Sequence, residues 1–340
     1  MSPAREARET RLDRRSLLKT TAAGTMVGLA GCSQVLGGGE EYPSEAITIV
    51  VPYAEGGGTD GYARIIQDPL SEELGVEVRI NNIPGETPVT GLNELVTNPE
   101  DSYQLGMAGH LGLVGSALIF ADWAPSELTM LGSVGSLAIS CYGNAKYDWG
   151  GLNDMVERFN SGEFEQVASI GFGTPFHLVS LIARERADWN WEQWVSYEGA
   201  APSVQAVAQD EVPFGVIASV VLRPHYQQDT EIDVIGTFAD DGDPTMPEVE
   251  TWSEAGLTSV NEVSTILMSV FGPPEMPDGH RDTIDEALQA IMETDAIAGA
   301  REETGLLIDS FATADELSEQ VATLEEEIPE TVDLDQYRDQ

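Results

Sequence analysis

Lysine is almost absent from this sequence of 340 residues, in which Lys19 and Lys146 are the only two. The 16 lysines and arginines face 59 aspartates and glutamates, which gives a formal net charge of −43. A surface this acidic repels a phosphate backbone, so nucleic-acid binding is excluded. Because the acids are spread through apolar, periodic segments, they are typical of a folded surface kept hydrated in concentrated salt, as in a halophilic archaeon; a cation-binding surface is the alternative.

Cysteine is equally scarce, with Cys32 and Cys141 alone. We assign Cys32 to lipid attachment below, so Cys141 has no partner for a disulfide and is expected to be a small buried apolar residue. The four histidines and Cys141 form no recognisable metal-ligand set. No Ser/His/Asp arrangement is supported either, so we expect neither a metal, nor a cofactor, nor catalysis.

A run long enough to cross a bilayer is also missing. Arg14 and Arg15 precede a short apolar stretch, residues 20–30, and together they resemble a twin-arginine export signal. The following "LAGC" resembles a lipobox ending at Cys32, which predicts a signal over 1–31 and a lipidated tether over 32–44. The protein is then expected on the outer face of the cytoplasmic membrane, attached by lipid and monomeric.

Segments typical of strands and helices alternate from residue 46 onward. Buried or alternating apolar runs predict strands at 46–51, 76–80, 103–108, 131–141, 167–170, 214–218, 232–238 and 265–271. Helical spacing predicts helices that include 60–74, 175–187, 201–209 and 282–292. This alternation predicts an α/β fold with two lobes and parallel sheets, whose ligands bind at the carboxyl ends of the strands.

Three glycine-containing loops stand between an expected strand and an expected helix. They are "EGGGTD" at 55–60, "GFGTP" at 171–175 and "YEGAAP" at 197–202. Thr59 or Asp60 is expected to cap the first helix, while Thr174 and Pro175 suit the N-cap and first helical position of the second. Backbone N–H groups at such helix starts suit an anion, although glycine before a helix is also ordinary turn chemistry.

Nucleotide binding is poorly supported at these loops. The Gly-Lys-[Ser/Thr] ending of a P-loop is missing, and no loop carries a full G-x-G-x-x-G run.

Four ordered motifs carry a family resemblance. The stretches "YPSEAITIVVPYAEGGGTDGYARII", "SIGFGTPFHL", "VSYEGAAPSVQAVAQDEVPFGV" and "TMPEVETWSEAGL" resemble the substrate-binding receptors of tripartite tricarboxylate transporters. The resemblance implies a hinged, two-lobed periplasmic-binding-protein fold of type II (a Venus-flytrap fold), with two mixed, mostly parallel sheets. It closes on a small organic anion and delivers it to membrane subunits. The resemblance suggests lobe 1 over 45–140 and 243–340, and lobe 2 over 141–242.

The resemblance also implies a set of ligand-binding residues, taken position by position. Lobe 1 would offer Tyr53, Gly56, Gly57, Thr59, Asp60, Gly85, Thr87, Gly109 and His110. Lobe 2 would offer Gly171, Gly173, Thr174, His177, Tyr197, Gly199, Ala200 and Ser219. For His177, packing within the hinge is the alternative to a ligand contact.

Three acids depart from the family pattern, namely Glu55, Glu86 and Glu198. They face either solvent or a positive group on the ligand, so an amino acid remains an alternative to a mono-, di- or tricarboxylate. A receptor for another type of transporter or for a sensor, and a surface hydrolase or lyase, are the further alternatives.

Overall fold

The computed structural model describes residues 42–85, 87–304, 306–309 and 312–338. The expected signal over 1–31 and Cys32 therefore lie outside the described residues, as does Glu86. The strands are β1 (Ile47–Val51), β2 (Val78–Asn82), β3 (Gln104–Gly109), β4 (Thr129–Asn144), β5 (Gln166–Ile170), β6 (Gln193–Tyr197), β7 (Phe214–Ala218), β8 (Ile232–Thr237) and β9 (Thr265–Gly272).

Helices follow most of these strands. They are α1 (Gly58–Leu74), α2 (Pro88–Thr97), α3 (His110–Phe120), α4 (Leu152–Asn160), α5 (Pro175–Ala187), α6 (Ala200–Ala208), α7 (Ser219–Leu222), α8 (Asn261–Ser264), α9 (Asp278–Ile291), α10 (Asp295–Thr304) and α11 (Ala314–Thr331). The predicted α/β class is thus confirmed.

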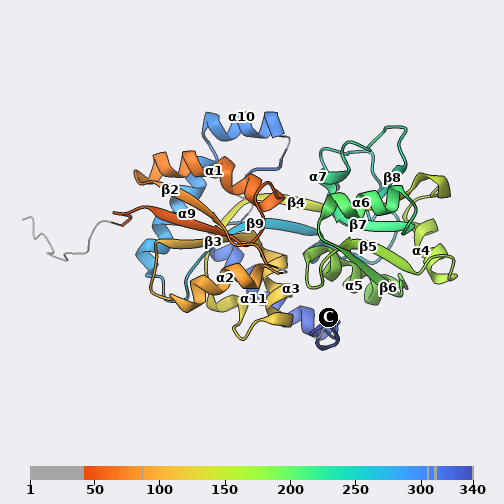
Figure 1. Cartoon of the computed structure of the whole chain (residues 1–340), viewed down its shortest axis with the longest axis horizontal. Helices are drawn as coiled ribbons and strands as arrows, with labels where there is room; N and C mark the ends of the chain where they lie inside the picture. The colour runs from red at the N-terminus through yellow and green to blue at the C-terminus, as the bar shows by residue number, and fades with distance from the viewer. Residues whose placement is uncertain (1–41, 86, 305, 310–311, 339–340) are drawn as a thin grey trace, which may run out of the picture. The chain divides into compact units, whose positions relative to one another are not determined.

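The strands run in the order β2-β1-β3-β9-β4-β7-β5-β6, and β8 pairs with β4 outside this path. We call β1, β2, β3, β9 and residues 129–138 of β4 the first strand group. Residues 139–144 of β4 with β5, β6, β7 and β8 are the second strand group (Figure 1). In Figure 1, α1 and α10 lie on one side of the first group and α2, α3 and α11 on the other.

The long strand β4 belongs to both groups. Its residue Ala138 pairs with Thr265 of β9, and the next residue, Ile139, pairs with Ala218 of β7. Cys141 is buried in the second part of β4, as expected, and burial raises the pKa of its thiol. The sheets are mixed, because β9 and β4 are antiparallel to their neighbours while β1, β2 and β3 pair in parallel.

Strand directions bring the carboxyl ends of the two groups to face each other. β3 and β4 are both antiparallel to β9, so β1 and β3 run along β4 toward its second part. β7 and β8 are antiparallel to that second part and β5 is parallel to β7, so these three run back toward the first part. The loops that leave these strands therefore meet near the middle of β4.

Candidate functional site

The first glycine loop leaves its backbone open. Gly56, Gly57 and Gly58 are all exposed, and Gly56 has a φ of 78°, a left-handed conformation that favours glycine. The helix α1 begins at Gly58 with Gly57 as its N-cap, and no side chain caps it from that position. The expectation that Thr59 or Asp60 is the N-cap is therefore wrong by two to three residues, since the glycines already allow the turn.

Asp60 organises this loop from inside the helix. Its carboxylate accepts hydrogen bonds from the Gly56 N–H at 2.8 Å, from Arg64 Nε at 2.8 Å and from Asn82 Nδ2 at 3.0 Å. Burial alone would raise the pKa of Asp60, but these donors together hold it below its ordinary value. Asp60 thus fixes the loop, while the N–H groups of Gly58 and Thr59 remain at the positive end of α1.

The second glycine loop, residues 171–174, is built differently. The Thr174 hydroxyl accepts from the His177 N–H at 3.4 Å and lies 2.9 Å from the Ile170 carbonyl and 3.0 Å from the Gly171 carbonyl. Thr174 is the N-cap and Pro175 the first residue of α5, as predicted. Because one hydroxyl has a single proton, the Thr174 side chain is already engaged by its own loop.

The small residues of α3 lie against the second glycine loop and against Tyr53, which precedes the first. A Cβ on Gly112 would sit 3.3 Å from Pro175 Cδ and 3.7 Å from the Tyr53 hydroxyl. A Cβ on Gly115 would be 2.8 Å from the Gly173 carbonyl oxygen, to which Ser116 Oγ also donates at 3.3 Å. The structure thus brings together Tyr53 and the Gly173 loop at α3.

Two histidines among the expected ligand residues are buried and neutral. His110 Nδ1 accepts from the Leu267 N–H at 3.0 Å, and His177 Nδ1 accepts from the Gly173 N–H at 3.3 Å. Burial lowers the pKa of His110 to about 4. Burial, with a smaller effect of Arg184, lowers the pKa of His177 to about 3. Since Nδ1 accepts in both rings, each neutral ring carries its proton on Nε2.

The C-terminal turn covers His177. Tyr337 packs edge-on against the His177 ring at 4.6 Å between centroids, and stacks on Phe172 at 5.8 Å. His177 Nε2 is buried and has no hydrogen-bond partner among the described residues. This packing resembles the hinge alternative more than an open ligand contact, although the ligand role of His177 stays a prediction.

The remaining expected residues lie at other strand ends. Ser219 begins α7 and its hydroxyl is 2.6 Å from that of Ser140 in β4. Gly199, with a φ of 153°, is the N-cap of α6, and Tyr197 ends β6. Gly109 ends β3, and Thr87 is the N-cap of α2. No distance joins these residues to the first glycine loop, so their membership of one site stays a prediction.

Two of the three unusual acids are exposed in this structure. Glu55 lies 3.7 Å from Arg64, in a pair whose side chains are largely solvent-accessible. Glu198 is likewise exposed at the end of β6.

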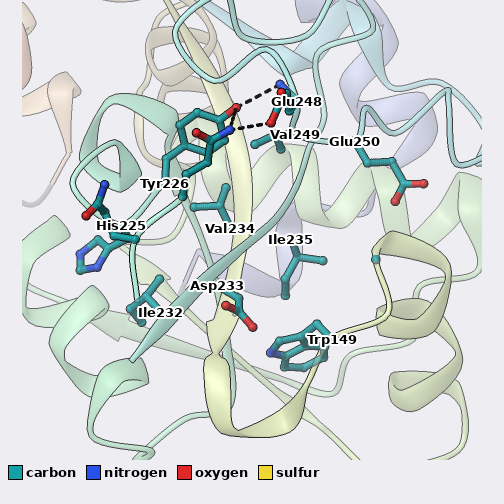
Figure 2. Close-up of a pocket in the computed structure, with 13 residues that line it drawn as sticks. Trp149, His225, Tyr226, Ile232, Asp233, Val234, Ile235, Glu248, Val249 and Glu250 are labelled. Atoms are coloured by element: carbon teal, nitrogen blue, oxygen red, sulfur yellow. Dashed lines mark hydrogen bonds between the residues drawn. The ribbon is translucent and has the colours of Figure 1, made fainter. Parts of the chain in front are cut away.

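A separate pocket of about 490 Å³ lies at the other end of the second group. Figure 2 shows it beside Trp149, Tyr226, Asp233 and Glu250, where the Tyr226 hydroxyl accepts from the Glu248 N–H at 3.2 Å. Its lining includes Ile232, the first residue of β8, so it faces the amino end of that strand. It contains none of the expected ligand residues.

The described residues contain neither a candidate membrane span nor a candidate metal cluster. None of the described helices combines the length and the apolar character needed to span a membrane. Within the same residues, no three His, Cys, Asp or Glu side chains gather as a metal would require.

Two strand groups that share a strand and turn their carboxyl ends toward each other define an α/β periplasmic-binding-protein fold. MatC of Rhodopseudomonas palustris, solved with bound malate, has this fold with a TM-score of 0.70 and 20% identity, over 84% of this chain and 100% of that one. R. palustris Rpa4515, solved with adipate, gives a TM-score of 0.73 at 18% identity, over 87% and 99%.

Residues 62–323 match the family described as tripartite tricarboxylate transporter family receptor, and the chain belongs to this family. A protein encoded in the tcbD-tcbE intergenic region of Pseudomonas sp. strain P51 is 26% identical over 277 residues, 78% of this chain and 80% of that protein. BugT of Bordetella pertussis is 22% identical over 272 residues, 77% and 82% of the two chains. The class of protein is therefore a solute-binding receptor.

Proposed function

We propose that this receptor captures a small organic anion between the two strand groups and delivers it to the membrane subunits of a tripartite tricarboxylate transporter. The observation that carries the proposal is the meeting of two loops at one helix: Tyr53, ahead of the first glycine loop, and Pro175, at the start of α5, both lie beside Gly112. The start of α1 offers the free N–H groups of Gly58 and Thr59 to a carboxylate. The start of α5, where Pro175 has no N–H and the His177 N–H is bound to Thr174, contributes mainly the positive end of its helix dipole.

The affinity for the anion should come from direct hydrogen bonds and not from long-range electrostatic attraction. A hydrogen bond to a charged group contributes roughly 1.5–3 kcal/mol, and a helix terminus adds about 0.3–1 kcal/mol. Loss of residues 1–31 removes six basic and three acidic groups, so the mature charge moves from −43 to −46. Such a domain repels anions at a distance, but the Debye length is only about 3 Å at 1 M salt. Affinity for a carboxylate should therefore rise from low to molar salt while the domain stays folded.

The direct test is a thermal-shift screen of organic acids and amino acids in multimolar KCl, followed by calorimetry. A carboxylate that binds the native state raises the melting temperature by mass action. Stabilisation by no carboxylate in the panel would contradict the proposal. Stabilisation by amino acids alone would favour the amino-acid alternative, and turnover of a bound acid would favour the hydrolase or lyase.

We also propose that the two strand groups are the cores of two hinged lobes, with the boundaries expected above. A ligand can signal to a membrane partner only if it favours one of two conformations. Small-angle scattering should then show a smaller radius of gyration with ligand bound. A radius unchanged by a ligand that calorimetry detects would count against hinge closure.

Attachment at the outer face of the cytoplasmic membrane rests on the N-terminal motifs. Cys32→Ser should release the protein from membranes and leave ligand binding unchanged, since the tether separates the lipid from the folded domain. Replacement of Arg14 and Arg15 by lysine should block export. A Cys32→Ser protein that remains on membranes after a high-salt wash would refute the lipid anchor.

The transporter partner can be identified from neighbouring genes. A large membrane subunit with many helices and a small companion with four helices would support the tripartite system. A neighbouring ATPase would indicate an ATP-driven transporter instead.

A further inference from the structure

Arg223 is unusual in this acid-rich chain because it forms no ion pair with any described carboxylate. Residues 42–338 contain ten arginines and lysines. Eight of them pair with an acid within 4.0 Å, and they are Arg64, Arg79, Lys146, Arg158, Arg184, Arg281, Arg301 and Arg338. Arg223 instead donates from Nε to the Thr245 hydroxyl at 2.9 Å. A positive charge that avoids carboxylates in a chain of this composition is available to an external anion.

The partner of Arg223 is itself held firmly. Asp243 is only 4% exposed, and its Oδ1 accepts from the Thr245 N–H at 2.7 Å and from the Thr245 hydroxyl at 2.6 Å. The single hydroxyl proton goes to Asp243, so the oxygen lone pair accepts from Arg223 Nε. Asp243 thus reaches the guanidinium only through Thr245, and no described residue accepts a hydrogen bond from the two terminal nitrogens of Arg223.

Arg223 also lies on the correct edge of the second group. It follows α7, which leaves the carboxyl end of β7, while Thr245 is in the loop that leaves the carboxyl end of β8. These ends face the first group, and Figure 1 shows α7 at the edge of the second group toward α1. The charge of Arg223 reaches the Tyr62 hydroxyl of α1, where it opposes the rise in pKa that burial causes.

Tyr62 ties this position to the first glycine loop. It lies on α1, the helix that begins at Gly58, and its hydroxyl donates to the Ser136 carbonyl in β4 at 2.9 Å. The guanidinium of one strand group therefore lies near the helix of the other group that starts at the open glycine loop. A ligand with two charges could contact both.

We propose that Arg223 is a specificity-determining residue that binds the second carboxylate of a short dicarboxylate, while the first glycine loop binds the other carboxylate. The inference rests on the proposed function and narrows it to one substrate class. A guanidinium matches a carboxylate with two parallel N–H donors, which an ammonium group or a backbone N–H cannot do. A monocarboxylate of the same length would use the glycine loop alone.

The test is calorimetry in multimolar KCl with two dicarboxylates, succinate and adipate, and the monocarboxylates of equal length, butyrate and hexanoate. The native protein should bind at least one dicarboxylate more tightly than its matched monocarboxylate. Arg223→Gln should weaken dicarboxylate binding by roughly tenfold to a hundredfold and leave monocarboxylate binding unchanged. Arg223→Lys should recover part of the loss, because it restores the charge without the paired donors.

Two further variants make the result interpretable. Arg79→Gln changes the net charge by the same amount on the exposed strand β2, where Arg79 pairs with Glu77, and should leave all four affinities unchanged. Thr245→Val removes the acceptor that holds Arg223 Nε and should weaken dicarboxylate binding less than Arg223→Gln does. Arg223→Gln affinities that are unchanged, or that fall equally for both acid classes, would overturn the inference. Native protein that binds none of the four acids, nor any carboxylate in the wider screen, would instead refute the proposed function.

Discussion

The two glycine loops have similar sequences and different structures. In the loop at residues 54–60 the three consecutive glycines are exposed, and a Cβ on Gly56 or Gly58 would contact nothing within 4 Å. In the loop at 171–174, Gly173 has a φ of 70° and packs on Ser116 and Ile119 of α3. The first loop presents its backbone, while the second is locked into the contact between the strand groups.

This difference shows that glycine before a helix has two separate uses. It lets the backbone approach a ligand, or it lets two helices approach each other. A sequence motif does not distinguish them, because the neighbour that fills the missing Cβ position comes from a distant segment.

The largest expected effect is the loss of folding stability at low pH, because one buried histidine lies beside each strand group. The folded pKa values, about 4 for His110 and about 3 for His177, lie below the ordinary value of 6.5. Below pH 6.5 the unfolded chain therefore binds more protons than the folded chain. The contribution of the two neutral histidines to the free energy of unfolding is complete above that pH and falls as the pH decreases. With two protons the slope should approach roughly 2.7 kcal/mol per pH unit between pH 6 and 4.

Denaturant unfolding at pH 7, 6 and 5 in constant KCl would measure this slope. The single variants His110→Gln and His177→Gln should each remove about half of it, which would show that both groups are acid-sensitive. A free energy of unfolding that does not change from pH 7 to 5 would contradict the buried, neutral state of both rings.

A smaller effect is expected for Asp60→Asn in the first loop. Loss of the charge weakens the bonds from Gly56, Arg64 and Asn82, which should cost about 2–3 kcal/mol in the free energy of unfolding. Since the folded pKa of Asp60 is lowered, its stabilisation is present above about pH 4 and is lost as pH falls through the folded pKa.

The difference in the free energy of unfolding between Asp60→Asn and the native protein should consequently be largest near neutral pH, and it should become smaller in acid. Asp68→Asn, an exposed change on the same helix, is the control and should alter stability by less than about 0.5 kcal/mol. Equal effects of the two changes would mean that Asp60 does not organise the loop.

The next largest effect is the difference in folding stability between the Gly115→Ala and Gly58→Ala variants. A Cβ on Gly115 would lie 2.1 Å from Leu178 Cδ1 and 2.8 Å from the Gly173 carbonyl oxygen, so alanine should cost roughly 1–3 kcal/mol through overpacking. Gly58 has open space at its Cβ and a helical position, so alanine there should be neutral or slightly stabilising. Thermal unfolding of both variants would measure these effects. A Gly115→Ala protein as stable as the native one would show that the close contact of α3 with the second loop does not require glycine at this position.

The smallest effects are expected for the two threonines. Thr174→Val removes the N-cap of α5 and should lower stability by about 1 kcal/mol. The Thr59 hydroxyl has no hydrogen-bond partner among the described side chains and backbone groups, so Thr59→Val should barely change stability and should weaken carboxylate binding by roughly 1 kcal/mol.

Unfolding and calorimetry on both threonine variants would separate the two loops. If Thr59→Val lowers stability and leaves affinity unchanged, the first loop is a turn and not a ligand contact.

Local signals were sufficient for much of the fold. Strand β1, the glycine loop and α1 follow from a buried apolar run, three glycines and helical spacing, and the start of α5 follows from Thr174 and Pro175. Strand β6 was missed because Gln193–Tyr197 is half-exposed and does not alternate. Strand β4 is three residues longer at its C-terminal end than expected, because its last residues pair with β8 and β7.

The helix α3 was the more important omission. Almost all of His110–Phe120 is buried, so the segment has no polar face and no helical period to detect. Gly112 and Gly115, three residues apart, were the one available signal of a close helix contact. Arg223 could not have been singled out either, since the absence of an acid beside it depends on segments far away in the sequence.

The shared strand β4 has a mechanical consequence. Between Ala138 and Ile139 the hydrogen-bonded neighbours change from β9 to β7, while the backbone continues without a break. A rigid rotation of one group against the other must therefore be taken up by torsions at this junction and at the few other crossings. Under the proposed hinge, the stiffness of the β4 backbone at this junction, together with that of the other crossings, should limit how far one lobe rotates against the other.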